Sequence, residues 1–275
     1  MRTLIPLLAM CGALAASPIP DSLRASLSFH ASFDQSFDAD TALGDRRIHS
    51  APDYKQQGVA QPGVGAVDAT IEKGAGIGGG GALRFQSKNT QALFFSGDRN
   101  VTLSNGAISF WLRLDPDKDL APGFCDPIQI TDKAYNDSAI WVDFTKDDRP
   151  RHFRLGVFGS LKAWNPANSP ADQNPVFAKR LVVVERPPFT RDAWTHVAVT
   201  WSGLNAGSTG SASLFLNGKL IATASGIREP FEWDPQRLAI RLGVNYTGLM
   251  DEVALFRREL SGQDVAALYR AGGSK

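Results

Sequence analysis

Two adjacent carboxylates, Asp251 and Glu252, occur in a stretch of the chain that is otherwise almost entirely apolar. If residues 248–256 form an extended strand, in which alternate side chains share a face, the positions two before, two after and four after Asp251 are all aliphatic. An ionised carboxylate on a buried face costs several kcal/mol unless another group compensates it. A hard cation would do so, and so would backbone N–H donors or an arginine such as Arg241. The sequence therefore predicts a compensated carboxylate at Asp251 and leaves its partner open.

Aromatic side chains in polar loops are the second set of residues that could do chemistry, as platforms for a ligand. Sugar rings present apolar C–H faces that stack on such rings, while neighbouring amides and carboxylates bind the hydroxyls. We expect core positions for three tryptophans that fall in predicted strands, namely Trp111, Trp194 and Trp201. The rings that we predict to be exposed and to bind a ligand are Trp164, Trp233, Tyr135 and Tyr246. The alternative is that these rings only seal loops onto the core.

Motifs of well-known catalytic and metal sites are missing from the sequence. It contains neither His-Glu-x-x-His nor Gly-x-Ser-x-Gly. The glycine-rich stretch at residues 74–81 is followed by neither Lys-Ser/Thr nor a helix start, which argues against a phosphate-binding loop. The four histidines are far apart and form no ligand spacing: His30, His49, His152 and His196. We therefore predict no catalytic residues and expect the protein not to be an enzyme.

The overall composition is that of a globular protein and argues against a nucleic-acid partner. Of the 275 residues 43% are apolar and 21% are charged, and the formal net charge is +1. Domains that bind nucleic acid usually carry a strongly basic surface, because they must neutralise phosphates. The length fits a single all-β domain.

The first sixteen residues, MRTLIPLLAMCGALAA, have the features of a removable signal peptide. A single arginine provides the positive charge, an apolar stretch follows at residues 4–14, and Ala13-Leu14-Ala15 gives a small-x-small cleavage pattern. A lipid anchor at Cys11 is the alternative, but Met10 places a bulky side chain where a lipoprotein signal has a small one. The apolar stretch is too short to span a bilayer, so we predict a secreted protein, extracellular or periplasmic, with no transmembrane segment in the mature chain. Cys125 would then be its only thiol, and no internal disulfide could form.

Short stretches of apolar/polar alternation predict a protein built from antiparallel strands. The clearest are residues 194–201 and 211–217, and Asn217-Gly218 after the second is a strong hairpin signal that leads into a third strand from Lys219. Further strands are predicted at 25–34, 82–85, 91–96, 107–114, 138–145, 152–158, 237–243 and 247–256. No helices alternate with these strands, which favours an antiparallel two-sheet sandwich over an α/β fold.

Three other regions complete the chain. Residues 17–24 are expected to form an N-terminal tail. Five prolines fall between residues 160 and 190, which predicts a long loop or an excursion at a sheet edge, where functional residues are often found. The chain closes with a predicted helix, in which Ser261 and Asp264 have the spacing of a capping box and Gly272 lies where the helix would end.

Four of the strand-like stretches occur in an order that resembles a known superfamily. They are AISFWLRL at 107–114, WTHVAVTW at 194–201, SLFLNGK at 213–219 and GLMDEVALFRREL at 248–260. Together they resemble the laminin G-like branch of the concanavalin A-like lectin/glucanase superfamily, as found in bacterial secreted proteins. The resemblance extends over about residues 29–269 and implies an all-β jelly roll of two curved antiparallel sheets over residues 25–275, with a short C-terminal helix. Because the superfamily includes lectins, adhesion modules and glycosidases, the fold alone does not decide the function.

The resemblance implies two further points about particular residues. Relatives often hold a structural Ca²⁺ between a late aspartate and the N-terminal segment, and the matching residues here are Asp34 and Asp251, with backbone carbonyls completing the oxygen coordination. Asp38 and Asp40 could contribute, or hydrogen bonds could replace the metal altogether. Laminarinase-like relatives carry Glu-x-Asp-x-x-Glu, whose carboxylates act as nucleophile and acid/base. This chain has only Glu232-Trp233-Asp234 in a proline-flanked loop and lacks the final glutamate.

These observations predict a secreted, non-catalytic binding module for a carbohydrate, with a structural calcium ion as a further expectation. The chief alternative is a protein-binding or adhesion module of the same fold. A divergent glycoside hydrolase is the weaker alternative, because its catalytic signature is incomplete.

Overall fold

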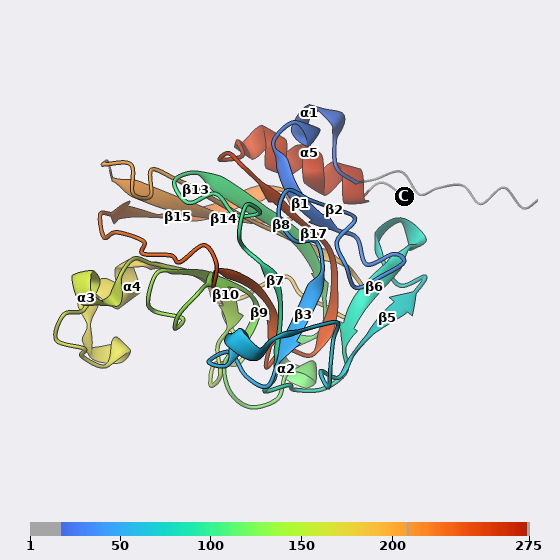
Figure 1. The fold of residues 1–275 in the computed structure, drawn as a ribbon, viewed down its shortest axis with the longest axis horizontal. Helices are drawn as coiled ribbons and strands as arrows, with labels where there is room; N and C mark the ends of the chain where they lie inside the picture. The colour runs from blue at the N-terminus through green and yellow to red at the C-terminus, as the bar shows by residue number, and fades with distance from the viewer. Residues whose placement is uncertain (1–17, 208, 274–275) are drawn as a thin grey trace, which may run out of the picture.

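The computed structural model describes residues 18–207 and 209–273, which form two antiparallel sheets packed face to face (Figure 1). The predicted all-β jelly-roll sandwich with a short C-terminal helix is confirmed. The predicted signal peptide, residues 1–16, lies outside the described residues.

Sheet A contains the strands nearest the C-terminal helix. In spatial order its strands are β15 (Lys219–Ile227), β14 (Gly210–Leu216), β13 (Thr195–Ser202), β8 (Gly106–Arg113), β17 (Gly248–Phe256), β1 (Leu27–Ala31) and β2 (Thr41–Ala42). A hairpin of β5 (Ala69–Lys73) and β6 (Gly81–Phe85) joins this sheet through β6, which pairs with one end of β17.

Sheet B forms the other layer. In spatial order its strands are β12 (Leu181–Val184), β11 (Phe153–Phe158), β10 (Ala139–Phe144), β9 (Cys125–Thr131), β16 (Ala239–Val244), β7 (Ala92–Ser96), β3 (Ile48–Ala51) and β4 (Gln61–Pro62). The α-helices are α1 (Asp21–Arg24), α2 (Pro116–Asp119), α3 (Leu161–Trp164), α4 (Pro175–Lys179) and α5 (Gly262–Gly273). The 3-10 turns are η1 (Gln57–Val59), η2 (Ile77–Gly79) and η3 (Ala171–Gln173).

The core lies between the two sheets because alternate residues of each strand point inward. On β13 the side chains of Val197 and Val199 belong to this core, whereas Ala198 belongs to a separate cluster on the outer face of sheet A. On sheet B, Ile128 and Ile130 face inward in the same way. The two-residue period that predicted the strands therefore also decides which layer of the molecule each side chain enters.

The outer face of sheet A is covered by α1 and α5 (Figure 1). Ile19 and Leu23 are buried there beside Val265 of α5, so residues 18–24 are docked on the domain and the expectation of a tail is wrong for them. The predicted capping box is confirmed, since the Ser261 hydroxyl accepts from the Asp264 backbone N–H and the Asp264 carboxylate accepts from that of Ser261.

The end of α5 differs from the prediction. The helix continues to Gly273, so Gly272 is a helical residue and not its cap. Gly272 is buried against Trp111, and a Cβ added to it would lie 2.5 Å from that indole ring. A glycine at this position is therefore explained by close packing of the helix on the sheet.

The proline-rich excursion at residues 160–190 contains α3, η3, α4 and the edge strand β12. It lies at one end of sheet B, where α3 and α4 project beyond the strands (Figure 1). The prediction of an excursion at a sheet edge is confirmed, because β12 is the outermost strand of that sheet.

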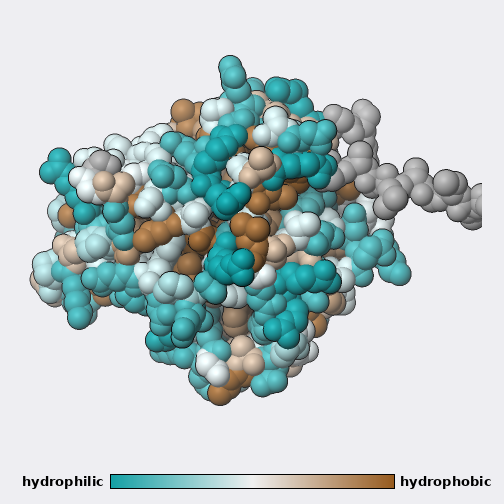
Figure 2. Space-filling model, turned by 45° about the horizontal axis from the view of Figure 1, so that its top comes forward, coloured by the Kyte–Doolittle hydropathy of each residue, from teal (hydrophilic) through white to brown (hydrophobic). Residues whose placement is uncertain are grey.

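Within the described residues, no helix has the length and apolarity needed to cross a membrane. Figure 2 shows one face of the molecule, on which hydrophilic residues predominate and apolar residues appear as separate patches between them.

Candidate functional site

A cavity of about 540 Å³ opens on the outer face of sheet B. Its floor comes from β9, β10 and β11. Its walls come from the segment before β9, the β9–β10 loop, the excursion and the end of β16 with the turn after it. The lining residues combine aromatic rings with charged and amide groups: Phe124, Asp126, Gln129, Tyr135, Trp141, Asp143, Arg154, Ala171, Phe177, Val244 and Asn245.

The strand period places the polar residues on this face. Ile128, Val142 and Leu155 point into the core, so their neighbours Gln129, Asp143 and Arg154 point outward into the cavity floor. Trp141 lies two residues before Asp143 and shares its face. Its indole crosses Gly156 of the neighbouring strand, where an added Cβ would lie 2.2 Å from the ring. A glycine is therefore needed opposite this tryptophan.

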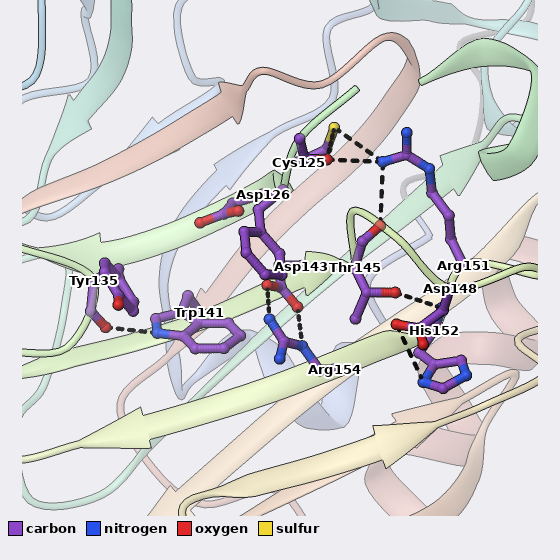
Figure 3. Close-up of polar contacts among 12 residues, drawn as sticks. Cys125, Asp126, Tyr135, Trp141, Asp143, Thr145, Asp148, Arg151, His152 and Arg154 are labelled. Carbon is purple, nitrogen blue, oxygen red and sulfur yellow. Dashed lines mark hydrogen bonds and ion pairs between the residues drawn. The ribbon is translucent and has the colours of Figure 1, made fainter. Parts of the chain in front are cut away.

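Asp143 and Arg154 form a buried ion pair on adjacent strands (Figure 3). Arg154 donates from Nε to Asp143 Oδ1 at 2.8 Å and from Nη2 to Oδ2 at 2.5 Å. Burial raises the pKa of Asp143, and the bidentate arginine opposes that rise. Because the arginine cation binds both of its carboxylate oxygens, Asp143 is stabilised in its ionised form.

Asp126 on β9 is the second acid of the cavity, and its surroundings are different. Gln129 Nε2 donates to its Oδ2, and no cationic side chain among the described residues forms an ion pair with it. Burial, and next the negative charge of Asp143, raise the pKa of Asp126 to about 8. Burial and the neighbouring charge therefore favour the protonated form of Asp126, which can donate a hydrogen bond as well as accept one.

Aromatic rings surround these polar groups. The Trp141 indole donates to the Tyr135 carbonyl at 2.6 Å, which connects β10 on the floor to the loop that carries Tyr135. The Arg154 guanidinium lies over the rings of Phe124 and Trp141, at 5.0 and 5.5 Å from their centroids. Phe177 of α4 packs on Phe158 and closes the cavity on the side of the excursion. The cavity thus offers flat apolar surfaces beside hydrogen-bonding groups.

Of the four rings predicted to bind a ligand, only Tyr135 lines this cavity, and 45% of it is exposed. Trp164 is buried against Phe158 and donates to the Asn136 carbonyl. Tyr246 is fully buried and its hydroxyl donates to the Leu249 carbonyl. The expected exposure of these two rings is therefore wrong, because both satisfy their polar atom inside the fold.

Trp233 is half-buried and packs against Phe231, with its indole N–H donating to the Ser138 carbonyl. It does not line the cavity. Of the strand tryptophans, Trp201 lies in the core as expected, and Trp111 is buried beneath α5.

The principal residues of the cavity were not predicted as a site. A signal for part of it was present, because Trp141 and Asp143 share the outward face of a strand predicted at residues 138–145. Arg154 lies on the next predicted strand. Asp126 and Gln129 lie on β9, which was not predicted, since Pro127 interrupts its alternation.

Asp34 and Asp251, the predicted calcium ligands, both contact the glycine-rich turn that contains η2. Asp34 Oδ1 accepts from the Gly81 backbone N–H at 2.9 Å, and Asp251 Oδ2 accepts from that of Ile77 at 2.6 Å. A Cβ on Gly80 would lie 1.7 Å from Asp34 Oδ1, so the turn follows the carboxylate closely. The structure therefore places two acids from distant parts of the chain against one loop.

The charge at this turn is incompletely compensated. Burial, and then the nearby Glu252 carboxylate, raise the pKa of Asp251 well above its ordinary value. Glu252 itself is bound by His30, with 2.5 Å between Oε2 and Nε2. Carboxylate oxygens suit a hard cation, whereas the backbone groups that contact these two carboxylates are N–H donors. Among the described residues, however, no three His, Cys, Asp or Glu side chains are grouped as a metal site would require.

Arg241, considered as a partner for Asp251, lies on sheet B instead. Its Nη1 donates to Gln129 Oε1, and its guanidinium lies over the ring of Tyr54. Backbone N–H donors are the partners that Asp251 has, from Ile77 and Glu252. Glu232, from the incomplete glucanase signature, accepts from the Ser160 hydroxyl and does not line the cavity.

Comparison with known proteins relates this architecture to a family. A family profile described as the concanavalin A-like lectin/glucanases superfamily matches residues 86–266. A comparison with curated proteins finds no match.

Among solved structures, the fold is similar to that of domain 4 of AbnA, a GH43 extracellular arabinanase from Geobacillus stearothermophilus, which was solved in complex with arabinotriose. The TM-score is 0.55 and the sequence identity 17%, and the alignment covers 89% of this chain and 98% of the AbnA domain. The binding domain of botulinum neurotoxin DC, solved in complex with rat synaptotagmin II, has a TM-score of 0.56 and 11% identity, over 91% of this chain and 52% of that one. The binding domain of Paraclostridial Mosquitocidal Protein 1 has a TM-score of 0.55 and 13% identity, over 90% and 52%.

At such identities the structural similarity establishes the fold and no more. The chain spans about half the length of the two toxin binding domains. The family profile, by contrast, matches well over half of this chain, and it contains the strands that carried the resemblance in the sequence. The protein belongs to the concanavalin A-like lectin/glucanase superfamily.

Proposed function

We propose that the protein is a non-catalytic carbohydrate-binding module and that the cavity on sheet B holds the sugar. The observation that carries this proposal is the lining of the cavity, in which the exposed rings of Phe124 and Tyr135 stand beside Asp126, Gln129 and Asp143. Rings stack on the apolar faces of a pyranose or furanose, and the polar groups bind its hydroxyls. A cavity of about 540 Å³ also falls within the usual size range of small-ligand sites.

The charges of the cavity favour a neutral ligand. Arg154 neutralises Asp143, and Asp126 carries a proton at neutral pH. The lining residues therefore offer no unpaired carboxylate to a cation. A sugar hydroxyl, which both donates and accepts hydrogen bonds, matches Gln129 and protonated Asp126.

The same geometry supports binding over hydrolysis. Glycoside hydrolysis with two carboxyl groups requires one carboxylate that is free to act as nucleophile or base. In the cavity that carboxylate would have to be Asp143, and both of its oxygens are occupied by Arg154. Asp126 alone could supply a proton but could not complete the reaction.

Secretion and a structural calcium ion remain part of the proposal. Calcium would be held by Asp34 and Asp251, and it would stabilise the ionised form of Asp251, which burial and the nearby Glu252 disfavour. The arabinotriose bound to the AbnA domain is consistent with a glycan ligand for this fold.

A protein-binding module is the second candidate, and exposed residues at the sheet edges favour it. Leu220 and Ile221 of the edge strand β15 are 56% and 41% exposed, and Val183 of the edge strand β12 is 46% exposed. An edge strand with apolar side chains can pair with a strand of another protein. The toxin binding domain in complex with synaptotagmin is an example of a protein partner for this fold.

The two candidate functions predict different binding behaviour for one pair of variants. We would screen the protein on a glycan array and measure hits by calorimetry for the wild type, for Gln129→Ala with Tyr135→Ala, and for Leu220→Ser with Ile221→Ser. The proposal predicts that the cavity variant loses sugar binding and that the edge variant retains it. Absence of any sugar hit, or equal binding by the cavity variant, would overturn the assignment.

A further inference from the structure

A second cavity, separate from the carbohydrate site, lies at one end of sheet A and is lined by three arginines. Its volume is about 350 Å³, and its lining residues are Arg84, Arg113, Asp119, Arg191, Thr247, Gly248 and Leu249. The strand register creates it: Leu249 of β17 pairs with Arg84 of β6 on one side and with Arg113 of β8 on the other. Residues paired in this way share a face of the sheet, so the two guanidiniums flank one leucine.

Two of the three arginines have a carboxylate partner. Arg84 Nε donates to Glu72 Oε2 across the β5–β6 hairpin. Arg191 Nε donates to Asp119 Oδ1 at 2.9 Å, and its Nη2 contacts the same oxygen. These pairs hold Arg84 and Arg191 in place at the rim without using all of their N–H groups, since each guanidinium has five.

Arg113 is different, because among the described residues no carboxylate forms an ion pair with it. Its guanidinium lies over the Trp194 ring, 5.0 Å from the centroid, and the side chain is half-buried. The ring restricts the plane of the guanidinium but does not neutralise its charge. Arg113 is therefore an ordered cation whose N–H groups remain available to the cavity.

The count of charges around the cavity leaves a positive surplus. Three arginines face two bound carboxylates, Glu72 and Asp119. Of the two other acids that act on Arg191, Asp115 is bound by Lys118, and Asp192 is exposed and does not line the cavity. We propose that this pocket binds an oxyanion, a sulfate, phosphate or carboxylate group, between the guanidiniums of Arg113 and Arg84.

The chemistry of the pocket selects an oxyanion over a halide or a neutral ligand. The planar guanidinium presents parallel N–H donors that match two oxygens of one anion, and such charge-assisted hydrogen bonds are stronger than neutral ones. Leu249 and the backbone at Gly248 form an otherwise uncharged floor. This site does not depend on sugar binding at sheet B, although an acidic substituent of a polysaccharide and a free inorganic anion would both satisfy it.

The test follows the arginine side-chain Nε–H signals by NMR in protein labelled with ¹⁵N, titrated with sodium sulfate against sodium chloride at equal ionic strength. The wild type should show saturable shifts of the Arg113 and Arg84 signals with sulfate and not with chloride. Arg113→Gln should weaken sulfate binding by about tenfold or more, as expected for a lost charge-assisted pair. Arg113→Lys keeps the charge but lacks the planar fork, so it should bind more weakly than the wild type.

Arg237→Gln is the matched control, because Arg237 is exposed, does not line this cavity, and loses the same charge. It should bind sulfate as the wild type does, and thermal melts should show that both glutamine variants are folded. A second experiment compares the binding of a sulfated oligosaccharide, its desulfated form and free sulfate. If the sulfated oligosaccharide binds more tightly than free sulfate, the oxyanion that the pocket recognises is a substituent of a polysaccharide. Equal shifts with chloride, or equal affinity of the wild type and Arg113→Gln, would overturn the proposal.

Discussion

Both carboxylate oxygens of Asp143 accept hydrogen bonds from the Arg154 guanidinium, at 2.8 and 2.5 Å, on the floor of the cavity in sheet B. This contact joins β10 to β11, and it leaves the neighbouring Asp126 as the acid that carries a proton. The stability of the sheet and the chemistry of the site are therefore connected through one ion pair.

Arg154→Gln should destabilise the fold by about 3–5 kcal/mol, because it leaves a buried carboxylate without its cation. Asp143→Asn in the same chain should restore much of that loss, since no buried charge then remains. Urea unfolding of both variants and the wild type at pH 7 measures the effect. If the double variant were as unstable as Arg154→Gln alone, the loss would come from packing and not from the unpaired charge.

Asp126→Asn should stabilise the protein at alkaline pH. The pKa of Asp126 is about 8 in the folded protein and near 3.8 in the unfolded chain. The free energy of unfolding is therefore unaffected by this group below pH 3.8, and it decreases as the pH rises from there toward 8. Asparagine does not ionise, and at pH 8 we expect the free energy of unfolding to rise by up to about 5 kcal/mol, with little difference near pH 3.5. Thermal melts across this range test the sign, and a variant less stable than the wild type at pH 8 would contradict it.

Gly272→Ala should destabilise the protein by about 1–3 kcal/mol, because the added methyl group would meet the Trp111 ring at 2.5 Å. Gly273→Ala is its control, since an added Cβ there has no atom within 4 Å, and we expect a change of less than about 1 kcal/mol. The melting temperatures of the two variants, compared with that of the wild type, test this difference. Equal effects would mean that α5 does not pack closely at its end.

Removal of calcium provides a separate test of the glycine turn. The pKa of Asp251 is raised, so without a cation the fold loses stability as the pH rises, and Asp251→Asn should melt higher than the wild type in chelator at pH 8. Added Ca²⁺ should raise the melting temperature of the wild type by several degrees and leave that of Asp251→Asn unchanged. A wild type that melts at one temperature with chelator and with Ca²⁺ would remove calcium from the proposal.

Much of the fold could be predicted because several of its strands alternate between apolar and polar residues, as β13 and β14 do. The predicted hairpin at Asn217-Gly218 is confirmed, with β14 ending at Leu216 and β15 beginning at Lys219. The docking of residues 18–24 could not be predicted, because Ile19 and Leu23 are buried only by contacts with α5 and sheet A, which are distant in sequence.

The candidate site was harder to predict than the fold for the same reason. Asp126, Asp143 and Arg154 lie on three strands, and nothing in their local sequence shows that the cavity joins them. Tyr246 was predicted to be exposed because its segment is polar like a surface loop. The ring is buried instead, since Phe85 from β6 packs against it. Exposure of an aromatic ring depends on tertiary contacts that loop composition does not encode.

The central claim, that a sugar binds in the cavity on sheet B, is tested most directly by the indole N–H signals of the six tryptophans during titration with arabinotriose and a panel of neutral oligosaccharides. The indole of Trp141 forms part of the cavity lining, so its signal should shift with a saturable dependence on sugar. The signals of Trp201 and Trp111, which belong to sheet A and do not line this cavity, should stay fixed. Binding that moves Trp194 or Trp233 and leaves Trp141 unchanged, or no binding of any sugar in the panel, would contradict the account.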